Sequence, residues 1–126
     1  MEAGRLRRHR DWPEGVPLGL QCLEAAHWPR VEIVLSHAGA SGALVEALVA
    51  QGVDGLIAAG TGNGTLHRDL EAALRAAQAR GVAVRRTTRV ADGAVLAASD
   101  DALPDCGALT PVQARVELLL ELLAAR

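Results

Sequence analysis

The distribution of apolar residues along the chain predicts alternating strands and helices from residue 31 onward. Short apolar runs at 31–35, 54–59 and 81–87 have the length and the branched side chains of buried strands. A shorter run at 93–98 predicts a fourth strand. In residues 1–30 the apolar positions follow neither the helical period of 3.6 nor the strand period of 2, so we expect a linker or an extended arm there.

Three amphipathic stretches predict helices between and after these strands. The first runs from Ser41, a predicted N-cap, to a helix stop at Gly52. The second follows a glycine-rich loop, begins at Leu66 and ends at Gly81. The third opens with Thr-Pro-Val-Gln at 110–113, which combines a capping threonine, a proline at the first helical position and the glutamine of a capping box.

This order of elements predicts the fold class. We expect an α/β domain over residues 31–126: a small open parallel sheet of about four strands with helices on both faces, a flavodoxin- or Rossmann-like three-layer sandwich. Ligands of such sheets bind beyond the carboxyl ends of the strands. Here that edge is formed by 36–41, 60–65 and 87–92.

Composition narrows the classes of function. The 126 residues carry a net charge of −2, so we expect no nucleic-acid or membrane partner. All basic residues are arginine, which excludes Schiff-base and P-loop lysine chemistry. Cys22 and Cys106 lack metal-type spacing, so two reduced thiols and no metal are expected. No apolar run approaches the roughly 20 residues that span a bilayer, and we expect a cytoplasmic location unless a signal peptide precedes residue 1.

The glycine-rich loop at 58–65, Ala-Ala-Gly-Thr-Gly-Asn-Gly-Thr, is the strongest candidate for a binding site. Such a loop lets the backbone approach a ligand closely. A dinucleotide fingerprint would place a glycine at Thr65 and an acid near residue 85, where Arg85 and Arg86 stand, so no cofactor is expected. Two interpretations stay open. In one, the backbone and the short side chains of Asn63 and Thr65 help to form a site for a small polar ligand or an interface. In the other, the loop is a tight strand-to-helix turn without a ligand, in which Thr65 caps the next helix.

Six segments, in order, resemble the C-terminal domain of the bacterial-type L-asparaginase/glutaminase family. They cover roughly residues 28 to 126 and are Trp28–Val34, Gly52–Ile57, Ala59–Thr65, Arg80–Val84, Thr87–Val90 with Gly93, and Leu109–Arg115. The resemblance implies a two-domain amidohydrolase that converts asparagine to aspartate and ammonia. In that family the larger N-terminal domain carries the nucleophilic threonine in a Thr-Gly-Gly-Thr motif, with a lysine and an aspartate nearby. This sequence has neither the motif nor a lysine.

The resemblance also implies what the smaller domain does, which is to complete the active site of a neighbouring subunit. Thr65 and Asn63 are the implied substrate-binding residues, and Asp100 or Asp101 the acid that faces the substrate's amino group. The implied partners are the missing N-terminal domain, further copies in a dimer or tetramer, and an amino-acid amide, with asparagine and glutamine both open. We expect no catalytic residue in this chain and no activity from it alone. The alternative is a freestanding module that binds a small ligand or mediates assembly without catalysis.

Two histidines lie at the same edge of the predicted sheet. His37 follows the first strand, and His67 lies near the start of the second helix. Neither has a nucleophile beside it in sequence, so we expect no direct role in chemistry; the resemblance implies a contact role for His67. Arg89 and Arg115 lie within the family motifs, and we expect both in structural ion pairs.

Overall fold

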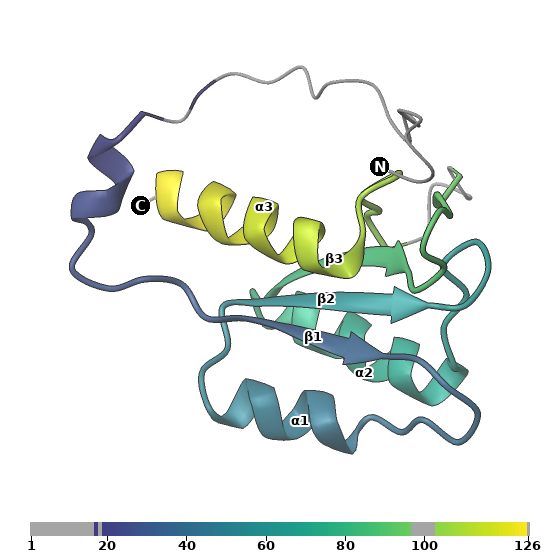
Figure 1. Cartoon of the computed structure of the whole chain (residues 1–126). Coiled ribbons are helices and arrows are strands. Elements are labelled where there is room, and N and C mark those ends of the chain that lie inside the picture. Colours follow the sequence, from purple (N-terminus) through teal and green to yellow (C-terminus); the bar gives the residue numbers. More distant parts are fainter. Residues whose placement is uncertain (1–16, 18, 97–102, 126) are drawn as a thin grey trace, which may run out of the picture.

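The computed structural model describes residues 17, 19–96 and 103–125, which form a three-layer α/β sandwich. A short 3-10 helix, η1 (Gln21–Glu24), precedes β1 (Val31–Leu35), α1 (Ala43–Ala50), β2 (Gly55–Gly60), α2 (Arg68–Ala79), β3 (Ala83–Thr88) and α3 (Pro111–Ala124). The strands are parallel in the order β1-β2-β3. Helix α3 covers one face of the sheet and α1 and α2 the other (Figure 1). The predicted fold class is confirmed.

The central strand β2 divides the hydrophobic core into two parts. All six of its residues are buried, and successive side chains point to opposite faces of the sheet. Leu56 and Ala58 join the larger cluster under α1 and α2, whereas Ile57 packs with Ala114 and Leu118 of α3. Helices cover both faces of the sheet, and this is why β2 carries no polar side chain at any position.

The predicted fourth strand is wrong for the residues that can be described. Residues 93–96 form no strand, and 97–98 lie outside the described residues. The backbone N–H of Val95 donates to Gly107 O at 2.8 Å, and that of Leu96 donates to the Asn63 side chain at 2.6 Å, so neither donor is available to a sheet ladder. The outer edge of β3 instead pairs with 104–106 through a parallel bridge between Arg86 and Asp105.

Helix starts agree with the sequence prediction only in part. Thr110 and Gln113 form the predicted reciprocal capping box of α3. Helix α1 begins after Gly42 without a side-chain cap, so the prediction of Ser41 as N-cap is wrong. Helix α2 is capped by His67 rather than by Thr65, because the loop stays non-helical for two further residues.

Several expectations concern the periphery of the fold. The predicted arm lies mostly outside the described residues, apart from η1 and the segment that leads to β1. Both cysteines are free thiols. An ion pair was expected for Arg115. Instead, its Nε–H donates to the backbone carbonyl oxygen of Val31 in β1 at 2.8 Å. No helix among the described residues is long and apolar enough to cross a membrane.

Candidate functional site

The glycine-rich loop forms a tight, closed turn at the carboxyl end of β2. Thr61 and Thr65 face each other across it, with backbone hydrogen bonds of 3.0 Å from Thr61 N and 2.8 Å from Thr65 N. Gly60 makes this fold possible, because a Cβ there would lie 2.4 Å from the carbonyl carbon of Gly64. Gly64 has a φ of +74°, which favours glycine. The backbone therefore needs its glycines where the sequence places them.

The loop presents two of the four predicted substrate-binding residues to solvent. Thr65 and Asn63 are both exposed, and both lie on the carboxyl edge of the sheet, as predicted from the order of elements. Asn63 also has a structural role, since its Oδ1 accepts the Leu96 backbone N–H and so ties the segment after β3 to the loop. The other two predicted residues, Asp100 and Asp101, lie outside the described residues.

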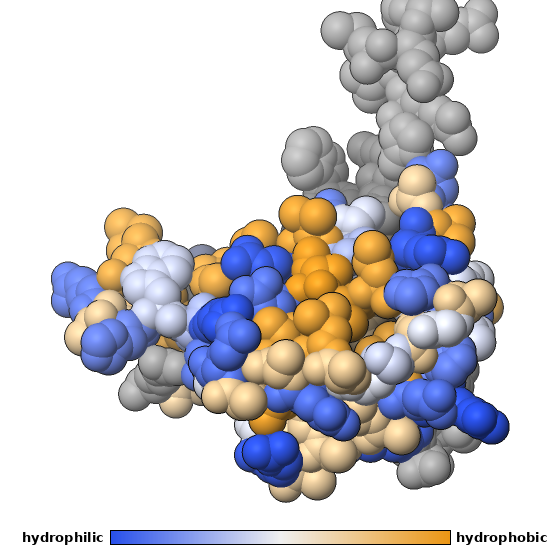
Figure 2. Space-filling view, turned by 90° about the horizontal axis from the view of Figure 1, so that it is seen from below, coloured by the Kyte–Doolittle hydropathy of each residue, from blue (hydrophilic) through white to orange (hydrophobic). Residues whose placement is uncertain are grey.

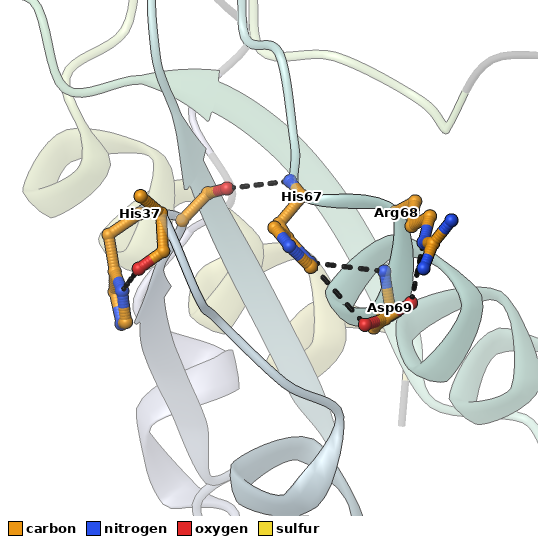
Figure 3. Close-up of polar contacts among 6 residues, drawn as sticks. His37, His67, Arg68 and Asp69 are labelled. Atoms are coloured by element: carbon orange, nitrogen blue, oxygen red, sulfur yellow. Dashed lines mark hydrogen bonds and ion pairs between the residues drawn. The ribbon is translucent and has the colours of Figure 1, made fainter.

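The histidines at this edge make structural contacts (Figure 3). The His67 ring accepts the Asp69 backbone N–H at its Nδ1 (3.3 Å) and so caps α2. This bond requires an unprotonated Nδ1, with the ring proton of the neutral form on Nε2. His37 is exposed, and its Nδ1 lies 2.9 Å from the carbonyl oxygen of Ala38. Neither contact joins an imidazole to a hydroxyl or a thiol.

No hydroxyl or thiol of the described sheet edge and core is arranged as an activated nucleophile. Ser36 is 3% exposed, and its Oγ accepts the backbone N–H of His67 at 2.8 Å, away from the ring. Thr87 and Thr88 are almost fully buried. Burial and, secondarily, Glu117 raise the pKa of the Cys106 thiol to about 11, so the thiolate is scarce at neutral pH. An acyl-transfer nucleophile needs a base hydrogen-bonded to it or a lowered pKa. The hydroxyls of Ser36, Thr87 and Thr88 bond to backbone groups, and the pKa of Cys106 is raised.

Arg86, on β3, was not predicted to be a site residue. In the sequence it indicated only that an acid expected of a nucleotide-binding motif is missing. Its neighbour Arg85 points toward α3, where its Nη2 lies 3.5 Å from Glu121. Arg86 points to the opposite face, and its stem runs beneath Gly64. Its Nε and Nη2 are buried and have no hydrogen-bond partner among the residues that the structure describes. The signal that separates the two arginines is the strand period of 2.

Two other features of the surface lie away from the glycine-rich loop. A groove of about 670 Å³ lies between η1 and the C-terminal end of α3, far along the sheet from the glycine-rich loop (Figure 1). Figure 2 views the molecule from the side of α1 and α2 and shows apolar residues gathered there among charged ones. The described residues contain no cluster of histidine, cysteine, aspartate and glutamate that fits a metal ion.

Comparison with known proteins gives the family. Residues 30–125 match the model of the glutaminase/asparaginase C-terminal domain. The chain is 42% identical over 99 residues to L-asparaginase 2 of Escherichia coli (strain K12), which covers 75% of this chain and 28% of that protein. It is 35% identical over 97 residues to L-asparaginase 2 of Bacillus subtilis (strain 168), which covers 75% of this chain and 26% of that protein. The chain thus spans about a quarter of the length of these relatives. It belongs to the glutaminase/asparaginase family, whose C-terminal domain it matches.

Proposed function

We propose that this domain completes the active site of an L-asparaginase-type amidohydrolase whose nucleophile is supplied by another domain. The observation that carries the proposal is the carboxyl edge of the sheet, which presents an ordered polar loop but, among the described residues, no activated nucleophile. Two relatives are named L-asparaginase 2, which supports an amino-acid amide as the substrate. The reaction would convert asparagine to aspartate and ammonia.

In this proposal the domain binds and orients the substrate. Thr65 and Asn63 supply exposed polar groups on a backbone that is closed by the bonds between Thr61 and Thr65. A rigid loop loses little conformational entropy when a ligand binds, so its polar groups can orient a small substrate effectively. Asp100 or Asp101 would face the substrate's amino group as an ionic partner.

The proposal includes two protein partners. An N-terminal domain would carry the nucleophilic threonine, and a second copy of the chain would bring this edge to a neighbouring subunit's pocket. Exposed apolar side chains at Leu35 and Leu44, each 55% exposed, are consistent with further protein contacts. Sedimentation equilibrium of the chain at several concentrations tests self-association, and a monomer at every concentration would remove the oligomer from the proposal.

The first experiment measures ammonia release by the chain alone. The protein is purified from a host without asparaginase genes and incubated with asparagine and with glutamine. We expect no release above that of buffer, because Ser36, Thr87, Thr88 and Cys106 at the described sheet edge and core are not activated as nucleophiles. Turnover that persists through purification and disappears in the Thr65→Ala variant would overturn the proposal that the nucleophile lies elsewhere.

The second experiment asks whether the domain works in an enzyme. Residues 30–125 replace the matching domain of Escherichia coli L-asparaginase 2, and kcat/KM for asparagine is measured for the chimera. Thr65→Ala is expected to lower kcat/KM by ten- to a hundredfold, about 1.4–2.7 kcal/mol of transition-state stabilisation. The matched control is Gln78→Ala, an exposed polar residue near the other end of α2, which should leave kcat/KM unchanged.

The chimera also separates this function from that of a freestanding binding module. An active chimera that loses activity with Thr65→Ala supports participation in the active site. A folded and assembled chimera whose kcat/KM is the same for Thr65→Ala, Asn63→Ala and Gln78→Ala would contradict it, because the polar loop would then contribute nothing to catalysis. Circular dichroism of each variant establishes that the comparison is between folded proteins.

A further inference from the structure

A buried arginine edge beneath the glycine-rich loop has no place in the proposed function. The aliphatic stem of Arg86 lies against the loop: a Cβ added at Gly64 would be 3.3 Å from Arg86 Cγ and 3.4 Å from Cδ. Beyond the stem, Nε and Nη2 are shielded from solvent and have no hydrogen-bond partner in the described part of the chain. A guanidinium stays protonated, so this edge keeps its charge when buried.

The identity of the two unpartnered nitrogens indicates the kind of group that would satisfy them. Nε and Nη2 form one side of the planar guanidinium, and their two N–H bonds are nearly parallel. A carboxylate accepts both in the side-on bidentate geometry, which neutralises the charge as well as satisfying the donors. A neutral carbonyl would satisfy the donors without compensating the charge, and buried charges are normally paired.

Among the described residues, no carboxylate is hydrogen-bonded to Nε or Nη2 of Arg86. Asp105 is paired with Arg86 through the backbone, but it is exposed and its Oδ1 accepts the Gly107 N–H at 2.9 Å. The Arg86 stem, which leads to this edge, lies under Gly64, and Val95 approaches the same glycine next to Leu96, whose N–H is bound by Asn63. It therefore adjoins the exposed polar loop at the carboxyl end of the sheet, where ligands of parallel sheets bind.

We propose that Arg86 is a carboxylate receptor, which binds one carboxylate group side-on through Nε and Nη2 beneath the glycine-rich loop. The carboxylate can come from a small organic acid or amino acid, or from an acidic side chain of the protein itself. This proposal does not rest on the amidohydrolase function, because the edge would be occupied in the same way in a protein without catalytic activity.

The test observes the Arg86 Nε–Hε group by nitrogen-15 NMR on the full chain at low temperature. The Arg86 signal is assigned as the one lost in Arg86→Lys, and the exposed Arg80 is the internal reference. Arg68 is unsuitable as a reference because its Nε–H already donates to Asp69 Oδ1 at 3.1 Å. The probe is succinate, and uncharged succinamide is the matched control. A carboxylate bound side-on moves Hε downfield and slows its exchange with water relative to Arg80.

Two results support the proposal and identify the source. A saturable downfield shift of the Arg86 Hε with succinate but not with succinamide indicates a small-molecule carboxylate. A downfield Arg86 signal present without any probe, which returns toward that of Arg80 in Asp100→Asn or Asp101→Asn, indicates an acid of the chain. An Arg86 Hε that matches Arg80 in position and exchange rate, and that neither the probe nor these variants move, overturns the proposal.

Discussion

Replacing Gly60 by alanine tests whether the closed loop at the carboxyl edge has the geometry described. The new Cβ would lie 2.4, 2.6 and 2.7 Å from Gly64 C, Gly64 O and Thr65 O. All three are backbone atoms of the same turn, so they cannot rotate away as a side chain would. The loop must open, which strains or breaks the backbone bonds between Thr61 and Thr65.

Two effects of opposite sign decide the size of the change. Alanine lowers the conformational entropy of the unfolded chain, and this effect alone would stabilise the folded protein by about 0.4–1 kcal/mol. Overpacking in a buried position costs about 1–3 kcal/mol, and each weakened hydrogen bond adds about 0.5–1.5 kcal/mol. We therefore expect Gly60→Ala to lower the free energy of unfolding by roughly 2–3 kcal/mol. For a domain of this size that corresponds to a fall in Tm of roughly 10–20 °C.

Gly55→Ala is the matched control in the same strand. Gly55 is also buried, but its added Cβ would meet side-chain ends, Leu118 Cδ2 at 3.0 Å and Leu122 Cδ1 at 3.2 Å. These atoms can move, so we expect a loss of no more than about 1 kcal/mol. Urea unfolding followed by circular dichroism gives both values. A Gly60→Ala protein as stable as the parent, or less destabilised than Gly55→Ala, would refute the described loop geometry.

Three further predictions concern α3 and its surroundings. Thr110→Ala removes the capping box and should lower the free energy of unfolding by about 1 kcal/mol in urea titrations; an unchanged midpoint would contradict the cap. Leu118 is 2% exposed, and Leu118→Ala should lower the free energy of unfolding by about 2–5 kcal/mol. Val116→Ala, on the exposed side of α3, should lower it by less than about 1 kcal/mol, and equal losses would contradict the described packing of α3. The folded state binds the Cys106 proton more tightly than the unfolded chain, whose thiol has the usual pKa of 9.0, because burial raises its folded pKa to about 11. This contribution to stability is complete below about pH 9 and is lost as the pH rises toward 11. Cys106→Ala should therefore make the unfolding midpoint depend less on pH between about 9 and 11. An equally steep dependence in the variant would contradict the raised pKa of Cys106.

The sequence predicted features that depend on local chemistry. The start of α3 is encoded in four consecutive residues, Thr110 to Gln113, and the capping box forms as expected. The apolar run of β2 and the glycine-rich loop after it are likewise local signals, and they place Asn63 and Thr65 at the carboxyl edge. The catalytic meaning of these two residues depends on partners outside the chain, so it remains a prediction.

Features that depend on contacts between distant residues were not predictable in this way. Leu96 gives its N–H to a side chain 33 positions earlier, so an apolar run that looks like a strand does not join the sheet. His67 caps α2 with its ring, a use of histidine that N-cap preferences do not anticipate. The strand period places Arg85 and Arg86 on opposite faces of the sheet, but only the packing of those faces shows that Arg85 is ion-paired and that Arg86 has a buried edge without a partner among the described residues.

The pairing of 104–106 along β3 also determines where another polypeptide can extend the sheet. Arg86 N donates to Pro104 O at 2.7 Å and Arg86 O accepts from Cys106 N at 2.9 Å, so the middle of that border is already hydrogen-bonded. Exposed strand borders are templates for aggregation and for strand addition. The sheet has two edge strands, β1 and β3, and among the described residues the outer border of β1 has no comparable backbone bridge. Growth of the sheet by a further chain is therefore directed to β1, which makes intermolecular β-pairing one-sided.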